Sequence, residues 1–325
     1  MSKYSLLLIS ENKPDTPAEI RHSNGMIAYG LWQEFSKMKH VDLHYYDCDI
    51  KGDYAKWSKE LRELPIYDFV LVHSYCPGYV FYDVPFLRQR GSHMMWISEN
   101  TFEGWLSKDV FVEFDHNFTF LPDWECRKVK SQEQIHLPCL KDVIDGTRST
   151  EKYRQPGSVL LDHAYDPNIY PEPGYLWCER LYNWLDRSGR AVGQLERIEH
   201  EQKANLVIPE WVHKIPNSRY LDYLHNTSAY ENFVVTHPGS YEHSVIDMVG
   251  RGIRVLVPRY NGQTFIPRDT VDRLELPTFS NMDEFFYQLN VPHDGRDNKS
   301  NRCMGMPEIA AQVDRYCQRI INGRK

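Results

Sequence analysis

Short apolar runs alternate with amphipathic stretches along the first 140 residues. Residues 4–10 (YSLLLIS) form an apolar run between polar neighbours, and residues 26–38 carry apolar side chains at helical spacing after a loop through Asn24 and Gly25. The same succession continues to residue 137. The pattern predicts strands at 41–47, 68–74, 93–98, 118–121 and 134–137, and helices at 53–64 and 79–91. Such alternation is typical of a parallel sheet with helices on both faces.

The alternation stops at 141–156, which is polar and has no periodicity, and resumes after it. We therefore take 141–156 as a linker between two domains. The second half predicts strands at 157–162, 191–197, 204–208, 232–237 and 253–258, and helices at 174–189, 218–226 and 242–252. The fold class expected is α/β, with tandem Rossmann-like domains at 1–145 and 156–305, followed by a helix at 306–325 whose apolar stripe must pack on a domain.

Composition supports a globular protein of two domains, since 325 residues exceed what one compact core usually holds. No apolar run approaches the roughly 20 residues of a membrane span, and the N-terminal run is too brief for a signal peptide. The seven cysteines are scattered and lack any CxxC pair, which fits a reduced, cytoplasmic setting. The net charge of −7 argues against nucleic acid as the main partner and leaves a local basic groove open.

One stretch, 236–258 (THPGSYEHSVIDMVGRGIRVLVP), concentrates candidate binding residues. In open parallel sheets, ligands bind beyond the carboxyl ends of the strands, where the loop His237–Glu242 is expected. The following helix would present free backbone N–H groups to a phosphate, and Gly239 and Ser240 would allow close approach. Asp247 lies three residues after Ser244, where a carboxylate can accept hydrogen bonds from both ribose hydroxyls. The alternative is an ordinary turn between strand and helix with polar filler.

The order and spacing of these residues are similar to the donor-nucleotide motif of GT-B glycosyltransferases. The matching residues are Thr236, His237, Gly239, Ser244, Asp247 and Gly252. The segments 68–100 and 118–139 also look like N-domain elements of that family. The resemblance implies two domains facing across a cleft, with the acceptor on the first domain, a sugar nucleotide on the second, and the last helix crossing back to the first.

The resemblance also implies roles for individual residues. Asp247 would hold the ribose, so Asp247→Ala is expected to weaken nucleotide binding and leave the fold intact. The diphosphate and sugar would be surrounded by His237, Gly239, Ser240, Glu242 and Ser244. Asn24 and Gly25 would approach the donor phosphates or the acceptor, unless they form a plain turn with Asn24 as a helix cap. Asp162 and His163 end the first strand of the second domain, facing the same cleft, or simply make hydrogen bonds at the sheet end.

Transfer of a sugar with inversion needs a base for the acceptor hydroxyl and positive groups or helix dipoles for the leaving diphosphate. Three residues near predicted strand ends are candidate bases: His22, His73 and Glu99. We favour Glu99, which Asn100 and Thr101 follow, and place His73 second; each can also be a satisfied polar residue at a strand end. Positive charge could come from second-domain loops at Arg197, Lys203, Lys214 or Arg259. No DxD-type motif stands out, so we expect a reaction without a metal or other cofactor.

The function these expectations favour is a glycosyltransferase that moves a sugar from a nucleotide-sugar donor to a carbohydrate, lipid-linked or other hydroxyl acceptor. A sugar-nucleotide epimerase of the same architecture is an alternative, because fold does not fix function. A second alternative is a non-catalytic GT-B-like protein that binds a nucleotide sugar. A DNA-modifying glycosyltransferase is a third, which the acidic net charge disfavours.

Overall fold

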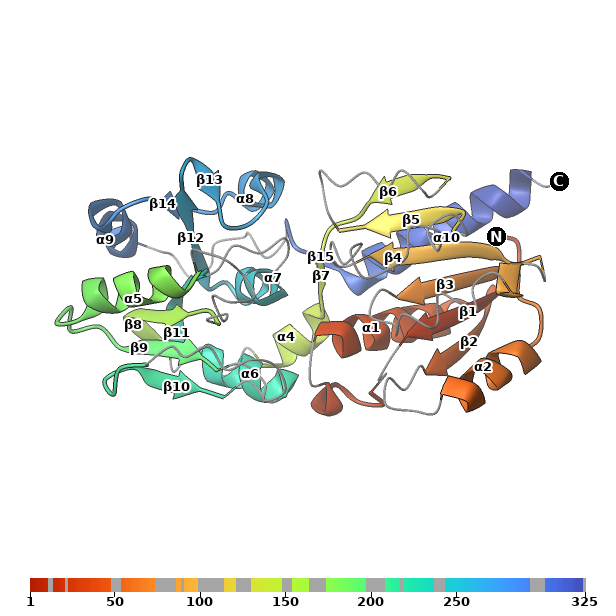
Figure 1. The fold of residues 1–325 in the computed structure, drawn as a ribbon, viewed down its shortest axis with the longest axis horizontal. Coiled ribbons are helices and arrows are strands. Elements are labelled where there is room, and N and C mark those ends of the chain that lie inside the picture. Colours follow the sequence, from red (N-terminus) through yellow and green to blue (C-terminus); the bar gives the residue numbers. More distant parts are fainter. Residues whose placement is uncertain are drawn as a thin grey trace. The chain divides into compact units, whose positions relative to one another are not determined.

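A computed structural model gives the structure of the protein (Figure 1). It describes residues 1–10, 14–20, 23–47, 54–73, 86–88, 91–98, 114–120, 130–147, 154–163, 174–196, 208–216, 219–236, 243–292 and 302–323. The chain divides into two compact units. Unit 1 comprises Met1–Pro138 and Met304–Lys325, and unit 2 comprises Cys139–Cys303.

Unit 1 is built on a parallel sheet in the order β2-β1-β3-β4-β5-β6. Its strands are β1 (Tyr4–Ser10), β2 (Val41–Asp47), β3 (Phe69–His73), β4 (His93–Ser98), β5 (His116–Thr119) and β6 (Gln132–Gln134). Its helices are η1 (Pro17–Glu19), α1 (Ser23–Lys37), α2 (Tyr54–Glu63) and α10 (Met306–Gly323). The predicted α/β alternation in this half of the chain is confirmed, although β5 and β6 begin two residues earlier than expected. Most of the helix expected at 79–91 lies outside the described residues.

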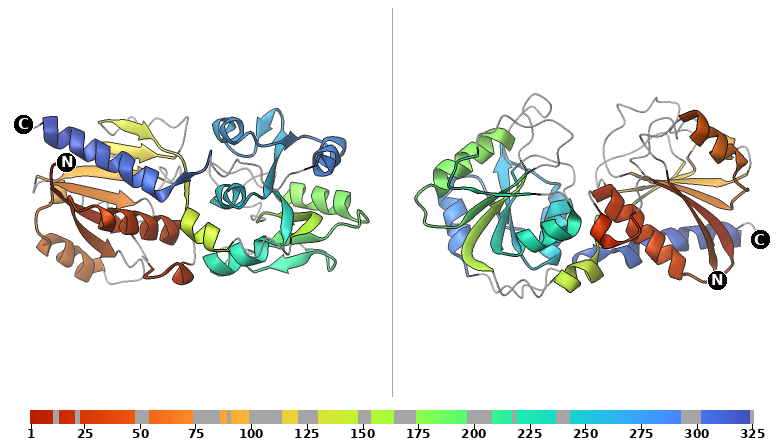
Figure 2. Two further views of the ribbon diagram at one scale, coloured as in Figure 1. Left: turned by 180° about the vertical axis from the view of Figure 1, so that it is seen from behind. Right: turned by 90° about the horizontal axis from the view of Figure 1, so that it is seen from below.

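Helices α1 and α10 lie side by side on one face of this sheet, and α2 lies on the other (Figure 2). A side chain at Gly30 of α1 would collide with Met306 of α10, so glycine lets the two helices approach closely. The inward face of α10 reaches the sheet: Tyr4 donates a hydrogen bond to Asp314 at 2.9 Å, and Cys317 contacts Met95. The C-terminal helix therefore completes the core of unit 1.

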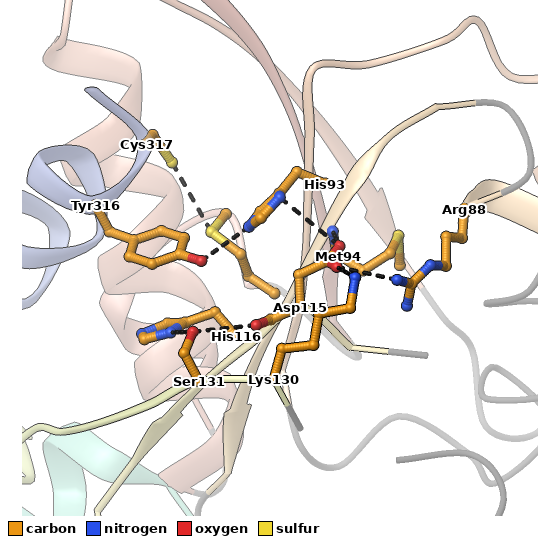
Figure 3. A network of polar contacts seen from close by, with 10 residues as sticks. Arg88, His93, Met94, Asp115, His116, Lys130, Ser131, Tyr316 and Cys317 are labelled. Carbon is orange, nitrogen blue, oxygen red and sulfur yellow. Dashed lines mark hydrogen bonds and ion pairs between the residues drawn. The ribbon is translucent and has the colours of Figure 1, made fainter. Parts of the chain in front are cut away.

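A cluster of polar side chains lies at the amino ends of β4 and β5, in contact with α10 (Figure 3). Asp115 accepts a hydrogen bond from Lys130 at 2.6 Å and one from the Met94 backbone N–H at 3.0 Å. The His93 ring lies 2.9 Å from the Tyr316 hydroxyl, and the His116 ring stacks on the Tyr316 ring with centroids 4.0 Å apart. These contacts anchor α10 near the amino ends of the strands, away from their carboxyl ends.

Unit 2 is built on a sheet in the order β10-β9-β8-β11-β12-β13, with β14 also paired to β12. Its strands are β8 (Gln155–Leu161), β9 (Val192–Leu195), β10 (His213–Ile215), β11 (Tyr230–Val234), β12 (Arg254–Tyr260), β13 (Gln263–Thr264) and β14 (Thr278–Phe279). Its helices are α4 (Lys141–Thr147), α5 (Gly174–Leu185), α6 (Tyr220–Thr227), α7 (His243–Gly250), α8 (Arg268–Leu274) and α9 (Met282–Asn290). All pairings are parallel except β12 with β13. The repeated α/β pattern is thus confirmed in the second half as well. The strand expected at 204–208 lies almost wholly outside the described residues, and β10 was not predicted.

Two groups of helices pack in unit 2. Trp177 and Trp184 of α5 contact Phe279 and Phe285, which joins α5 to α9 and β14. Helix α4 packs on α6 and on α7. The segment β13 to α9 was not predicted from the sequence pattern, and it completes the aromatic core on the α5 side.

The predicted domain boundaries at 145, 156 and 305 differ from those in the structure. The first unit ends at Pro138, and part of the predicted linker forms α4 inside unit 2. Only Ile144 and Thr147 of α4 are buried, so a polar sequence with so few inward positions shows no apolar period. The chain passes between the units a second time at Cys303, where β15 (Met304–Gly305) pairs with β7 (Pro138–Cys139).

The first helix also begins earlier than expected. Asn24 and Gly25 lie inside α1, in its first turn, and not in a loop before it. No helix in the described part of the chain has both the length and the apolar character needed to cross a membrane.

Candidate functional site

The strand order of each sheet identifies where a ligand would bind. In unit 1 the chain leaves β1 for β2 on one side and then crosses to β3 on the other, so the order reverses between β1 and β3. In unit 2 it reverses between β8 and β11. Ligands of open α/β sheets bind at such switch points, outside the carboxyl ends of the strands. Both positions carry polar side chains.

At the switch point of unit 1, Ser10 and His73 form a pair. Ser10 is the last residue of β1, His73 is the last residue of β3, and the Ser10 Oγ lies 2.8 Å from the His73 Nδ1. Both residues are fully buried. Of the candidate bases, His73 is therefore placed at a switch point. Ser10 was not predicted as a site residue, because the pattern shows that a strand ends there but not which strand lies beside it.

The tautomer of His73 decides what its ring can do. If the Ser10 hydroxyl accepts a hydrogen bond from Nδ1–H, the lone pair of neutral histidine is on Nε2. An imidazole of that tautomer can take a proton from a hydroxyl at Nε2. If Ser10 donates to Nδ1 instead, Nε2 carries the proton and is a donor. Ser10 can thus orient the His73 ring, and the direction of the hydrogen bond between them decides whether Nε2 accepts or donates a proton.

At the switch point of unit 2, Asp162 organises the end of β8. Its carboxylate is fully buried, accepts a hydrogen bond from the Ser244 hydroxyl at 3.2 Å, and accepts one from the His163 backbone N–H at 2.8 Å. The Asp162 backbone N–H donates to the Val234 carbonyl at 3.0 Å. Asp162 therefore joins β8 to the end of β11 and to the first turn of α7.

Neighbouring polar groups fix the main chain around Asp162. The Gln194 amide donates to the Asp162 carbonyl, and its oxygen accepts a hydrogen bond from Tyr182 at 2.9 Å. The Thr236 hydroxyl donates to the His163 carbonyl at 2.6 Å. Strands β8, β9 and β11 each contribute a polar residue at or just beyond their carboxyl ends. Gln194 was not predicted, since it lies inside a strand pattern.

These hydrogen bonds hold the strand ends against the N-terminus of α7. Ser244 is in the first turn of that helix, where backbone N–H groups lack partners within the helix and attract anions. The side chain of His163 remains 14% exposed, whereas that of Asp162 is not exposed at all. Asp162 therefore positions the groups around it, and His163 is the member of this pair that a ligand could touch.

Asp247 lies deeper than the sequence suggested. It is 2% exposed and accepts a hydrogen bond from the Tyr220 hydroxyl at 2.8 Å. Burial raises the pKa of Asp247 to about 7, against the opposing influence of Tyr220 and of Arg251 one turn along α7. Asp247→Ala would remove the acceptor of the Tyr220 hydrogen bond, so we expect the substitution to cost stability. That the variant keeps its fold stays a prediction, as does the contact of Asp247 with ribose.

Several predicted site residues cannot be placed. His22, Glu99, His237, Gly239, Ser240, Glu242, Arg197 and Lys203 lie outside the described residues. Asn24 and Gly25 belong to α1, where Gly25 is buried. Lys214 is exposed in β10, and Arg259 lies at the end of β12, 3.6 Å from Glu284, so neither is in a loop as expected. In the part of the chain that the structure describes, no group of three or more histidine, cysteine or acidic residues could hold a metal ion.

Two Rossmann-like units, with the last helix returning to the first, define the GT-B class of fold, and comparison with solved structures confirms it. Sucrose-phosphate synthase from Thermosynechococcus elongatus matches 99% of this chain and 100% of its own with a TM-score of 0.64 and 12% identity. No family model and no curated protein sequence matches the chain.

Two further solved structures are similar over nearly the whole chain. An alpha-glucosyltransferase in complex with UDP matches 95% of this chain and 96% of its own, with a TM-score of 0.59 and 10% identity. UDP-GlcNAc 2-epimerase from Methanocaldococcus jannaschii matches 97% and 99%, with the same TM-score and identity. At these identities the likeness establishes the fold alone.

Proposed function

We propose that this protein is a glycosyltransferase that moves a sugar from a nucleotide-sugar donor to a hydroxyl acceptor without a metal ion. The observation that carries the proposal is the cluster of Asp162, His163, Thr236 and Ser244 at the switch point of unit 2. This cluster lies in a fold shared with an alpha-glucosyltransferase whose structure was solved in complex with UDP-glucose. Unit 2 would take the donor, and unit 1 the acceptor.

The donor diphosphate would bind at the N-terminus of α7. The helix dipole and the free N–H groups of the first turn stabilise negative charge, which also helps the diphosphate to leave. Ser244 is held by Asp162, and the predicted loop His237–Glu242 leads into the same turn. His163 would contact the phosphates or the transferred sugar.

The acceptor hydroxyl would be activated in unit 1. As its oxygen bonds to the anomeric carbon and the bond to the diphosphate breaks, its proton passes to a base. His73 is a candidate for that role because Ser10 holds its ring through Nδ1, but the ring is fully buried, so its cover must open before an acceptor hydroxyl can reach it. Glu99 is the other candidate base from the sequence.

A thermal-shift titration with UDP, GDP, CDP and ADP tests donor binding, since a ligand of the folded state raises its stability. We expect one diphosphate to raise the unfolding temperature. Ser244→Ala should weaken its binding about tenfold, because losing the hydrogen bond from Ser244 to the charged Asp162 leaves the first turn of α7 less well positioned. Ser280→Ala, at an exposed position in unit 2, is the matched control. No shift with any diphosphate would contradict the proposal and favour a protein without this substrate.

A transfer assay with the diphosphate sugar then tests catalysis. We expect His73→Gln to lower kcat by roughly 10² or more with donor affinity unchanged, as for loss of a general base. Ser10→Ala should lower kcat less and shift its pH profile. Equal activity of His73→Gln and wild type would leave Glu99 as the candidate base.

A sugar-nucleotide epimerase is the second candidate, because the epimerase from Methanocaldococcus jannaschii matches as well as the alpha-glucosyltransferase does. Incubation of the nucleotide sugar without acceptor separates the two: an epimerase changes a stereocentre of the bound sugar, which NMR detects, and a transferase does not. Nucleotide-sugar binding with neither reaction would indicate a non-catalytic protein.

The acceptor panel includes duplex DNA beside sugars and lipid-linked sugars. A structure of alpha-glucosyltransferase in complex with UDP-glucose and DNA matches 96% of this chain at a TM-score of 0.56 and 10% identity. The net charge of −7 favours the other acceptors.

A further inference from the structure

Two cysteines far apart in the sequence meet where the chain enters and leaves unit 2. Cys139 is the first residue of that unit and Cys303 is the last. Cys139 belongs to β7, and Cys303 directly precedes β15, the strand that pairs with β7. The strand pairing brings the two residues together across the whole length of unit 2. Scattered cysteines without a CxxC motif gave no indication of this pair.

The two thiols contact each other and share one helix. They form a side-chain hydrogen bond, and Cys303 Sγ also donates to the Ile246 carbonyl at 3.7 Å. A Cβ added at Gly250 would lie 3.6 Å from Cys139 Sγ. Ile246 and Gly250 are one turn apart on α7, so both sulfurs rest on the same stripe of that helix. Both cysteines are almost wholly buried.

The surroundings of the two thiols shift their pKa values in opposite directions. The hydrogen bond from Cys139 lowers the pKa of Cys303 against the opposing influences of burial and of Asp247, and Arg273 and Lys141 lower it further. The hydrogen bond to Cys303, and then burial, raise the pKa of Cys139. Cys303 therefore ionises first, and a thiolate is the form that attacks a disulfide.

We propose that Cys139 and Cys303 form a reversible disulfide that closes unit 2 into a ring at the two points where the chain crosses between units. The oxidant is a low-molecular-weight disulfide such as glutathione disulfide. The Cys303 thiolate attacks one of its sulfurs and releases one glutathione thiolate. Cys139 then attacks the Cys303 sulfur of the mixed disulfide and releases the second, and the two released thiolates take up the protons that the cysteines lose.

Ring closure has a measurable consequence. A disulfide between the first and last residues of a unit removes much of the freedom of its unfolded chain, and the effect grows with the length of the closed loop. We expect the unfolding temperature of unit 2 to rise on the order of 10 °C upon oxidation. The inference is independent of the proposed function, because thiol–disulfide exchange at these cysteines requires no bound nucleotide or sugar.

Peptide mapping of the full-length protein tests the proposal. The reduced, folded protein is incubated with glutathione disulfide at pH 8 for hours, because buried thiols exchange only through local opening, and free thiols are then blocked before digestion. We expect a linked peptide pair containing Cys139 and Cys303, lost on reduction. Cys178, buried in α5 of the same unit, is the internal control and should stay free.

Three outcomes would overturn the proposal. One is a folded protein whose Cys139 and Cys303 stay free or carry only glutathione after prolonged incubation. Another is a linked pair that forms only in denaturant. The third is a pair that forms in the folded protein without raising the unfolding temperature of unit 2, which would remove the ring-closure effect. Cys303→Ser should abolish both the linked peptide and the temperature shift, and the wild-type mapping does not depend on that variant folding.

Discussion

Asp115 in unit 1 and Asp247 in unit 2 are both buried carboxylates, but their pKa values shift in opposite directions. Burial alone would raise the pKa of Asp115. The hydrogen bonds from Lys130 and from the Met94 N–H, with His93 and Arg88 nearby, outweigh burial and lower it (Figure 3). Asp115 is therefore ionised throughout the neutral range.

The pKa of Asp247 is raised to about 7, because burial outweighs the Tyr220 hydrogen bond and the attraction of Arg251. The comparison shows that several converging donors are needed to keep a buried carboxylate charged. The cluster at the amino ends of β4 and β5 has them, and the interior of α7 has fewer. Unit 2 thus contains an acid that changes protonation near neutral pH, beside the candidate donor site.

The largest effect is expected from Asp247→Asn, which should change how the stability of unit 2 depends on pH. A carboxyl whose folded pKa exceeds its unfolded value binds more protons when folded, so stability is fullest below the unfolded pKa near 4 and is lost as pH rises to about 7. The loss is at most about 4 kcal/mol between pH 4 and 8. In Asp247→Asn this contribution is absent, because an amide does not titrate.

Urea unfolding at several pH values, read by hydrogen exchange in unit 2 peptides, measures that difference. Asp222→Asn, an exposed position on α6, should follow the wild type. Parallel pH curves for Asp247→Asn and wild type would mean that Asp247 does not titrate in this range.

Asp115→Asn should act in the opposite sense. Its loss leaves Lys130 and the neighbouring cations without their carboxylate, and we expect unit 1 to lose about 2 kcal/mol at pH 7, since Lys130 is largely in water and its attraction is screened. The loss should shrink as pH falls through the lowered pKa of Asp115, where the wild type is neutral too. Chemical unfolding of unit 1, with exposed Asp42→Asn as control, measures it; a stabilised Asp115→Asn at pH 7 would refute the assignment.

A smaller effect is expected from Tyr220→Phe. The substitution removes the 2.8 Å hydrogen bond to Asp247, and we expect a loss of about 1 kcal/mol at pH 8. The cost should be lower at pH 5, because a hydrogen bond to an ionised carboxylate is stronger than one to the neutral acid. A double-mutant cycle with Asp247→Asn measures the coupling, and a cost independent of pH would show that the hydroxyl matters only for packing.

The smallest effect is expected from Arg88→Gln. The Arg88 guanidinium lies 3.1 Å from Asp115, and its side chain is 26% exposed. We expect a loss of about 0.5 kcal/mol that declines at high salt, as for partly exposed ion pairs. Denaturant unfolding at low and high salt measures it. A cost above that of Asp115→Asn would show that Arg88 has a separate structural role.

The fold could be predicted from the sequence largely because its central strands, such as β1 and β3, are buried on both faces. Runs such as residues 6–9 and 255–258 are continuously apolar, and the intervening helices are amphipathic, so period and length identify both kinds of element. The pattern failed where burial is one-sided and short, as in α4. It also failed at the start of α1, because Asn24 and Gly25 have low helix propensity and tertiary packing overrides it.

The candidate site was less accessible to sequence reasoning. Asp162, His163 and Ser244 could be named, since each lies at a strand end or a helix start. Ser10 and Gln194 could not, because their roles depend on which strands are neighbours, and strand order is a property of the folded sheet. The burial of Asp247 could not be predicted either, since it depends on contact with Tyr220 of α6, a segment distant in the sequence.

Unit 1 is discontinuous in the sequence, whereas unit 2 is continuous. The sheet of unit 1 therefore stays incomplete until the very end of the chain has been made. Until Met306–Gly323 has left the ribosome, the face that carries Met95 and Phe118 is uncovered. The half of the protein that is translated first is thus the half that matures last, and a nascent chain stalled before α10 should be a substrate for chaperones that bind exposed apolar surface.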